Sequence, residues 1–140
     1  MPFASFSLEV DATVETLWAV LVDKVENPTK FAPGVDSFEI LEREGDTLLR
    51  TMVTAAGEVT ERIRVDSAGL RVDSEFVDHF MYRGVTVKKI IRPDADGEKP
   101  ALTYTLDWER CDGQPDEGDL TPVAMAGVKH TKDIAEKRRP

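Results

Sequence analysis

Hydrophobic residues recur along the first part of the chain at two different spacings. Over residues 3–10 apolar and polar side chains alternate, and this period of two predicts a half-buried strand. From residue 14 the apolar positions recur at i, i+3, i+4 and i+7, which predicts an amphipathic helix over 14–25. Thr13 is placed to cap this helix, and Asn27-Pro28 to end it. The chain is therefore expected to begin with a strand followed by a helix.

After a proline-rich connection with room for one short helical turn, the period of two returns and persists through the middle of the chain. It predicts six more strands, over residues 37–43, 47–55, 58–65, 70–77, 84–92 and 101–110. Most connections between them are short and contain glycine. We therefore expect antiparallel neighbours, because a parallel crossover needs about a dozen residues or more. The connection over 78–83 is an exception, since it contains no glycine.

A last helix is expected over residues 122–137. Thr121 followed by Pro122 is typical of an N-cap followed by proline at the first helical position. One side of this helix is apolar and is expected to face the sheet; its residues are Val123, Ala126, Gly127, His130 and Ile134. Gly127 is expected to interrupt the helix, because glycine is a poor helix former.

The composition bounds the class of protein. The length of 140 residues fits one domain over 1–140, because soluble domains usually run about 100 to 150 residues. The 18 Lys and Arg residues against 27 Asp and Glu residues give a net charge of −9. A surface of that sign repels phosphate groups, so neither nucleic acid nor an anionic membrane is the expected partner.

Metal sites, disulfides and targeting segments are not expected. Cys111 is the single cysteine and cannot form an internal disulfide, and with two histidines it leaves too few ligands for a structural zinc site. The longest apolar run, residues 17–22, is too short to span a membrane, so a cytoplasmic location is expected. Motifs for covalent hydrolysis, nucleotide binding and calcium loops are absent, and the acidic segment 111–119 is interpreted as a solvated charge cluster. We expect no cofactor.

The order of elements and two local motifs resemble the helix-grip fold of the START and birch-pollen-allergen superfamily, called SRPBCC. Residues 11–18 (DATVETLW) are similar to its capped helix with an early tryptophan, and residues 31–35 (FAPGV) to its turn before the second strand. Glu61-Arg62 and the strand over 102–108 are most similar to the small microbial AtaL-like and polyketide-cyclase-like branch.

This resemblance implies an α+β fold in which a seven-stranded antiparallel sheet wraps around the C-terminal helix and leaves an internal cavity. Members of the superfamily hold lipids, polyketides, hormones or aromatic metabolites there, so the implied partner is a small apolar molecule. Residues 44–46 (EGD) replace the glycine-rich loop of the plant allergens, so plant-type ligands are not implied. Either a monomer or a homodimer is compatible with the sequence.

Glu61 is the first candidate for chemistry. Because side chains alternate along a strand, Glu61 lies on the same face as Val59, Ile63 and Val65. A carboxylate withdrawn from water has a raised pKa and can act as general acid or base near neutral pH. Three structural alternatives remain open: an edge strand, a wet face at this position, or an ion pair with an arginine.

The two histidines are further candidates. His130 falls on the apolar side expected to cover the cavity, although a merely solvent-exposed or hydrogen-bonded role is equally compatible with its place near the C-terminus. His79 follows Asp78, but adjacent residues of a strand point to opposite faces, which disfavours an acid–base pair.

Apolar residues on the strand over 101–110 form a candidate binding face. Tyr104 can orient a ligand carbonyl and Trp108 can stack on a planar ring, although ordinary core packing explains both equally well. Inward faces are expected to carry few charges. The predicted ligand contacts are Trp18, Phe76, Leu106, Trp108, Met125 and Ala126.

Two functions are compatible with these residues. One is an enzyme of cyclase, dehydratase or lyase type that acts without a cofactor, with Glu61 as base and Tyr104 or His130 as acid. The other is a non-catalytic protein that binds or carries a hydrophobic ligand. The enzyme is preferred, because a buried ionisable carboxylate lowers stability and is more readily retained for a task.

Overall fold

A computed structural model describes residues 3–31, 34–94, 98–113 and 119–138. These residues form seven strands and three helices, in the order that the sequence predicts. The elements are β1 (Phe3–Glu9), α1 (Val14–Glu26), α2 (Pro28–Phe31), β2 (Val35–Glu44), β3 (Thr47–Thr54), β4 (Gly57–Asp66), β5 (Arg71–Asp78), β6 (Tyr82–Ile91), β7 (Ala101–Arg110) and α3 (Thr121–Arg138).

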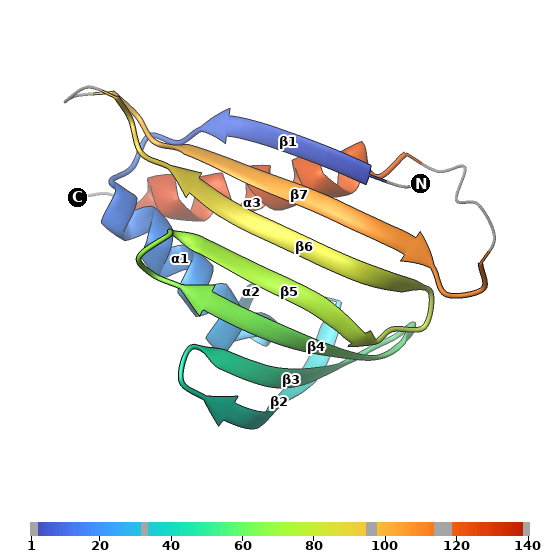
Figure 1. Cartoon of the computed structure of the whole chain (residues 1–140). Coiled ribbons are helices and arrows are strands. Elements are labelled where there is room, and N and C mark those ends of the chain that lie inside the picture. The colour runs from blue at the N-terminus through green and yellow to red at the C-terminus, as the bar shows by residue number, and fades with distance from the viewer. Residues whose placement is uncertain (1–2, 32–33, 95–97, 114–118, 139–140) are drawn as a thin grey trace.

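The seven strands form one antiparallel sheet in the order β1-β7-β6-β5-β4-β3-β2. All three helices lie on one side of it (Figure 1). Helix α3 packs against β1, β7 and α1, whereas α2 packs against β2. The predicted α+β helix-grip fold is therefore confirmed: the sheet curves around the C-terminal helix.

Local sequence explains how α1 begins and which side it buries. The Thr13 hydroxyl accepts a hydrogen bond from the Thr16 backbone N–H at 3.1 Å, which confirms the predicted N-cap. Leu17 and Leu21, four residues apart, are fully buried on the side facing the sheet. The short helical turn allowed by the sequence is α2.

The two junctions after β5 and before α3 differ from prediction. Strand β6 begins at Tyr82, two residues before the predicted start, so the connection from β5 is only three residues long. Thr121 lies inside α3 and does not cap it, because the carbonyl of Leu120 accepts the first helical bond, from the N–H of Ala124. The Asp119 carboxylate instead accepts from the Thr121 N–H at 2.9 Å.

The buried side of α3 is not the side that the sequence predicts. Its buried residues are Ala124, Val128, Thr131 and Ala135. Ala126 and His130 are exposed, and Val123 is 47% exposed. Because this helix has few apolar residues, the hydrophobic pattern does not define one face, and packing against β1, β7 and α1 selects another.

Gly127 does not interrupt α3, which is continuous over 18 residues. A Cβ atom at this position would lie 2.5 Å from Cε2 of Tyr104, far inside contact distance. Gly127 therefore allows the ring of Tyr104 on β7 to approach the helix backbone.

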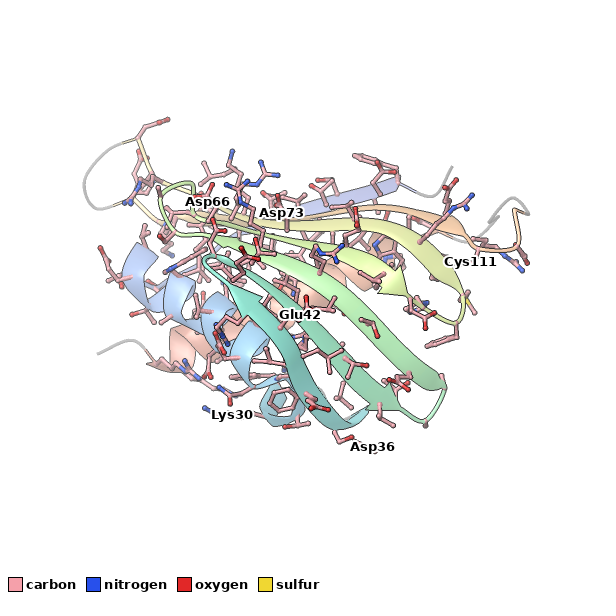
Figure 2. All side chains as sticks on the ribbon, turned by 60° about the horizontal axis from the view of Figure 1, so that its bottom comes forward. Lys30, Asp36, Glu42, Asp66, Asp73 and Cys111 are labelled. Carbon is pink, nitrogen blue, oxygen red and sulfur yellow. The ribbon has the colours of Figure 1, made fainter. Side chains whose placement is uncertain are left out.

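The opposite side of the sheet is polar. Asp66 and Asp73 lie on the side away from the helices, whereas Lys30 lies at α2, on the helical side (Figure 2). Cys111 is an exposed free cysteine at the end of the sheet opposite α1. Part of the FAPGV turn (residues 32–33) and most of the acidic segment (114–118) lie outside the described residues.

Candidate functional site

A cavity of about 330 Å³ lies between the sheet and the three helices. Its size is near the lower end of the range of about 300–1,000 Å³ typical of small-molecule sites. Charged and hydroxyl-bearing residues of its wall include Lys24, Arg50, Glu61, Thr86, Lys88 and Tyr104. Its apolar wall includes Phe31, Met52, Phe76, Leu106 and Trp108.

One wall of the cavity is aromatic. The rings of Phe76 and Trp108 lie 5.1 Å apart, and the ring of Tyr82 lies at the same distance from that of Trp108. The indole N–H of Trp108 donates to the hydroxyl of Thr86 at 3.0 Å, which fixes the ring. Phe76 and Trp108 face the cavity, so together they form a platform for a planar apolar ligand.

His79 supports this platform from behind. Its ring lies 4.5 Å from that of Phe76, and its Nδ1 accepts hydrogen bonds from the backbone N–H groups of Met81 and Tyr82, both at 3.0 Å. Burial lowers the pKa of His79, although the charges of Glu61 and Asp78 oppose the shift. His79 therefore orders the short connection between β5 and β6, and the disfavoured pair with Asp78 is not formed as a hydrogen bond.

Glu61 points to the buried side of β4, as the alternation predicts, together with Val59 and Ile63. Its register partner on β3 is Arg50, and Arg50 Nη2 lies 3.7 Å from Glu61 Oε1. Of the three structural alternatives for Glu61, the ion pair with an arginine is the one that the structure contains. Glu61 also lies opposite Phe76 on β5, so the carboxylate adjoins the aromatic wall.

Arg50 joins the sheet to α1. Its Nη1 donates to the carbonyl oxygens of Val25 at 2.8 Å and of Lys24 at 3.2 Å, at the C-terminal end of that helix. Burial lowers the pKa of Arg50, while the charge of Glu61 opposes the shift. Among the described residues, nothing accepts a hydrogen bond from the buried Nε of Arg50.

A hydrogen-bonded network surrounds Tyr104, another polar residue of the cavity wall. The Tyr104 hydroxyl lies 2.6 Å from Oγ1 of Thr131, and Lys24 Nζ donates to the same Oγ1 at 2.9 Å. The Thr131 hydroxyl donates to the carbonyl of Gly127 at 3.0 Å. Because that bond uses the only proton of Thr131, the Tyr104 hydroxyl acts as a donor to Thr131.

Two ammonium groups set the electrostatics of this wall. Lys88 Nζ lies 5.2 Å from the ring centre of Tyr104, its register partner on β7. Burial by itself would raise the pKa of Tyr104, but the charges of Lys88 and Lys24 outweigh it and lower the pKa. Burial lowers the pKa of Lys24; Tyr104 opposes that shift and Lys88 adds to it.

Comparison with known proteins identifies the family. Residues 4–136 match the family model described as acetylaranotin biosynthesis cluster protein L, or AtaL. The chain belongs to the AtaL family. No curated protein sequence matches it.

Solved structures share the fold of this AtaL family member. A START superfamily protein from Mycobacterium smegmatis has a TM-score of 0.68 and 18% identity, with 97% of this chain and 95% of that chain covered. The ZhuI aromatase/cyclase from Streptomyces sp. R1128 has a TM-score of 0.61 and 19% identity, with 96% of this chain and 87% of that chain covered. A protein from Thermus thermophilus has a TM-score of 0.63 and 18% identity, with 98% of this chain and 92% of that chain covered. At these identities the likeness concerns the fold.

The AtaL-family cavity brings together five of the residues that the sequence singles out. They are Glu61, Phe76, Tyr104, Leu106 and Trp108. The other four lie outside its lining: Ala126 and His130 are exposed, Met125 is partly buried on α3, and Trp18 lies beside a separate hollow near the β2–β3 hairpin. His130 contacts the site indirectly, since its Nδ1 lies 3.4 Å from Lys24 Nζ.

The expectation of few inward charges is wrong. Lys24, Arg50 and Lys88 all line the cavity, and none of them is among the candidate residues predicted from the sequence. The sequence contains a signal for each of them. Arg50 lies on the same face of its strand as Leu48 and Met52, two residues away on either side, and Lys24 follows the buried Leu17 and Leu21 at helical spacing. Lys88 shares the inward face of β6 with Thr86 and Ile90.

No metal site is formed by the described parts of the chain, where no three His, Cys, Asp or Glu side chains are grouped to hold an ion. Over the same residues, no helix is long and apolar enough to cross a bilayer.

Proposed function

We propose that this protein binds a small, mostly apolar molecule of aromatic or polyketide type in the cavity and converts it by cofactor-free acid–base chemistry. One observation carries the proposal: Glu61 and Tyr104, both buried, line the same cavity as the Phe76–Trp108 platform. The family description, which refers to a biosynthesis cluster, and the fold shared with an aromatase/cyclase support a role in the biosynthesis of such compounds.

In the proposed reaction the platform holds the ligand ring and Glu61 removes a proton from a carbon atom next to a carbonyl group. The electron pair of that C–H bond moves onto the carbonyl oxygen. Tyr104 gives its proton to this oxygen, and Lys24, which shares a hydrogen bond with Tyr104, can replace it. Each positioned proton-transfer group typically contributes about 10² to 10⁴-fold to the rate.

A carrier without catalysis is the second candidate, and two contacts favour it. Glu61 is engaged with Arg50, and the Tyr104 proton is engaged with Thr131. Both groups then serve to hold the cavity open and ordered, and neither acts on the ligand.

Two measurements test binding and conversion separately. A thermal-shift screen of aromatic and polyketide-like compounds tests binding, because a ligand at 100 times its dissociation constant adds about 2.7 kcal/mol of stability. Compounds that raise the melting temperature are then incubated with the protein, and the products are analysed by mass spectrometry.

The variants Glu61→Gln and Tyr104→Phe distinguish the two candidates. We expect each to lower turnover at least about 100-fold while binding is retained. Glu75→Gln, an exposed position on β5, is the matched control and should have no effect. A protein that binds these compounds and converts none of them supports the carrier; a protein that binds none contradicts both.

A further inference from the structure

We propose that the ligand carries a carboxylate, and that Lys24 and Lys88 bind this group at the Tyr104 end of the cavity. The inference deepens the proposed function and rests on it, because it assigns the class of ligand to the same cavity.

The charge of the cavity wall is opposite to that of the protein. Three basic side chains and one carboxylate line the cavity, a difference of two positive charges, whereas the whole chain carries −9. The one carboxylate, Glu61, is paired with Arg50. Lys24 and Lys88 are thus the positive charges of the wall that no carboxylate of the described residues neutralises.

The two ammonium groups differ in how many of their N–H donors are already engaged. Lys24 Nζ donates to Thr131, lies 3.4 Å from His130 Nδ1 and is also hydrogen-bonded to Tyr104, so it contributes to the subsite mainly by its charge. Lys88 makes a cation–π contact with Tyr104 but no hydrogen bond within the described residues. Burial and mutual repulsion disfavour the charged form of Lys24, and a bound anion would relieve both.

Arg50 adds a third basic side chain to the same cavity wall. Its side chain is 8% exposed, and its Nε–H has no acceptor in the described structure. The Nε atom is buried away from the cavity, so Arg50 contributes positive charge to this wall and not a free donor.

The two walls together define the ligand class as a small aromatic carboxylic acid. The ring lies against Phe76 and Trp108, and the carboxylate lies near Lys24 and Lys88. The cavity volume of about 330 Å³ limits the ligand to a small ring system.

Matched acids and amides test this assignment, because they differ in charge and hardly in shape. The probes are benzoate, 1-naphthoate and cinnamate with their primary amides, measured by calorimetry and by quenching of tryptophan fluorescence. We expect at least one acid to bind, and to bind at least tenfold more tightly than its amide.

Variants of Lys88 locate the subsite. Lys88→Met should lower affinity for the acid at least tenfold and leave affinity for the amide unchanged, and Lys88→Arg should retain acid binding. Lys89→Met, at an exposed position next along β6, is the matched control and should alter neither affinity. Circular dichroism and thermal melting of each variant show whether it folds.

The outcomes separate this inference from the proposed function. Equal affinities for acid and amide, or equal losses for both in Lys88→Met, overturn the carboxylate subsite and leave the apolar cavity intact. Binding of the amides alone overturns it as well. Failure of every probe to bind contradicts both the subsite and the proposed function.

Discussion

The two walls of the cavity are built on different principles. The aromatic wall consists of Phe76 and Trp108, backed by His79 and Tyr82, and its parts come from β5, β6, β7 and one short connection. The polar wall consists of Lys24, Arg50, Glu61, Lys88 and Tyr104, which come from α1, β3, β4, β6 and β7.

This difference determines how each wall responds to substitution. Ring contacts are numerous and individually weak, so losing one atom of the aromatic wall removes a part of the total. Buried polar groups depend on particular partners, so removing one partner leaves the other unsatisfied. We therefore expect a single substitution in the polar wall to cause a large loss of stability. Substitutions in the aromatic wall should cause losses that grow with the contact area removed.

Arg50→Ala should produce the largest effect, because it leaves the Glu61 carboxylate buried without its partner and removes the donor at the end of α1. We expect the free energy of unfolding to fall by about 3–5 kcal/mol, measured by chemical denaturation. The exposed pair Arg83–Glu109 provides the control, and Arg83→Ala should cost less than about 1 kcal/mol. Equal losses in the two variants would contradict the importance assigned to the buried pair.

Gly127→Ala tests the junction between the polar wall and α3. Helix propensity alone predicts a gain of about 1 kcal/mol, whereas the 2.5 Å approach of the new Cβ to Tyr104 predicts a loss. We expect the loss to prevail, by about 1–3 kcal/mol in unfolding free energy. Ala126→Ser, at the exposed neighbouring position, should stay within about 0.5 kcal/mol of the parent. A stabilised Gly127→Ala variant would show that Tyr104 does not pack on the helix backbone.

Trp108→Phe examines the aromatic wall. It keeps a ring against Phe76 and Tyr82 but loses part of the contact area and the hydrogen bond to Thr86. We expect a modest loss of about 0.5–1.5 kcal/mol, measured by the same denaturation experiment. A loss as large as that of Arg50→Ala would remove the contrast between the two walls.

The smallest effect on stability is expected from substitution of Asp23 on α1, which forms ion pairs with Arg138 at the end of α3 and with Lys30 of α2. The hydrogen bond from Arg138, with contributions from Asn27 and Lys30, lowers the pKa of Asp23 to about 2 from 3.8. A carboxyl group whose pKa is lowered by folding stabilises the folded state at every pH above its pKa in the unfolded chain. This stabilisation is lost as the pH falls from about 4 towards 2.

Comparing the protein with Asp23→Asn in acid tests this contact. The variant should be slightly less stable at neutral pH, and the difference should shrink as the pH approaches 2, as monitored by thermal melting. A difference that stays constant across this range would show that the Asp23 charge does not contribute.

The sequence by itself predicts nearly all the elements and the inward position of Glu61, because these depend on local periods. Alternation along β4 places Glu61 beside Val59 and Ile63, and alternation along β7 places Tyr104 and Leu106 on the buried face. A strand has only two faces, and one of them is mostly apolar here. A few residues are therefore enough to predict which face is buried.

Only the tertiary structure decides which side of α3 is buried and which cations enter the cavity. The helix has too few apolar residues to define a face, so its packing against β1, β7 and α1 buries Thr131 and exposes His130. Lys24, Arg50 and Lys88 lie far apart along the chain, on α1, β3 and β6, and meet because these three elements border the same cavity. A local pattern places each of them on an inward face, but it contains no information on whether that face meets packed side chains or a cavity, since this depends on elements distant in sequence.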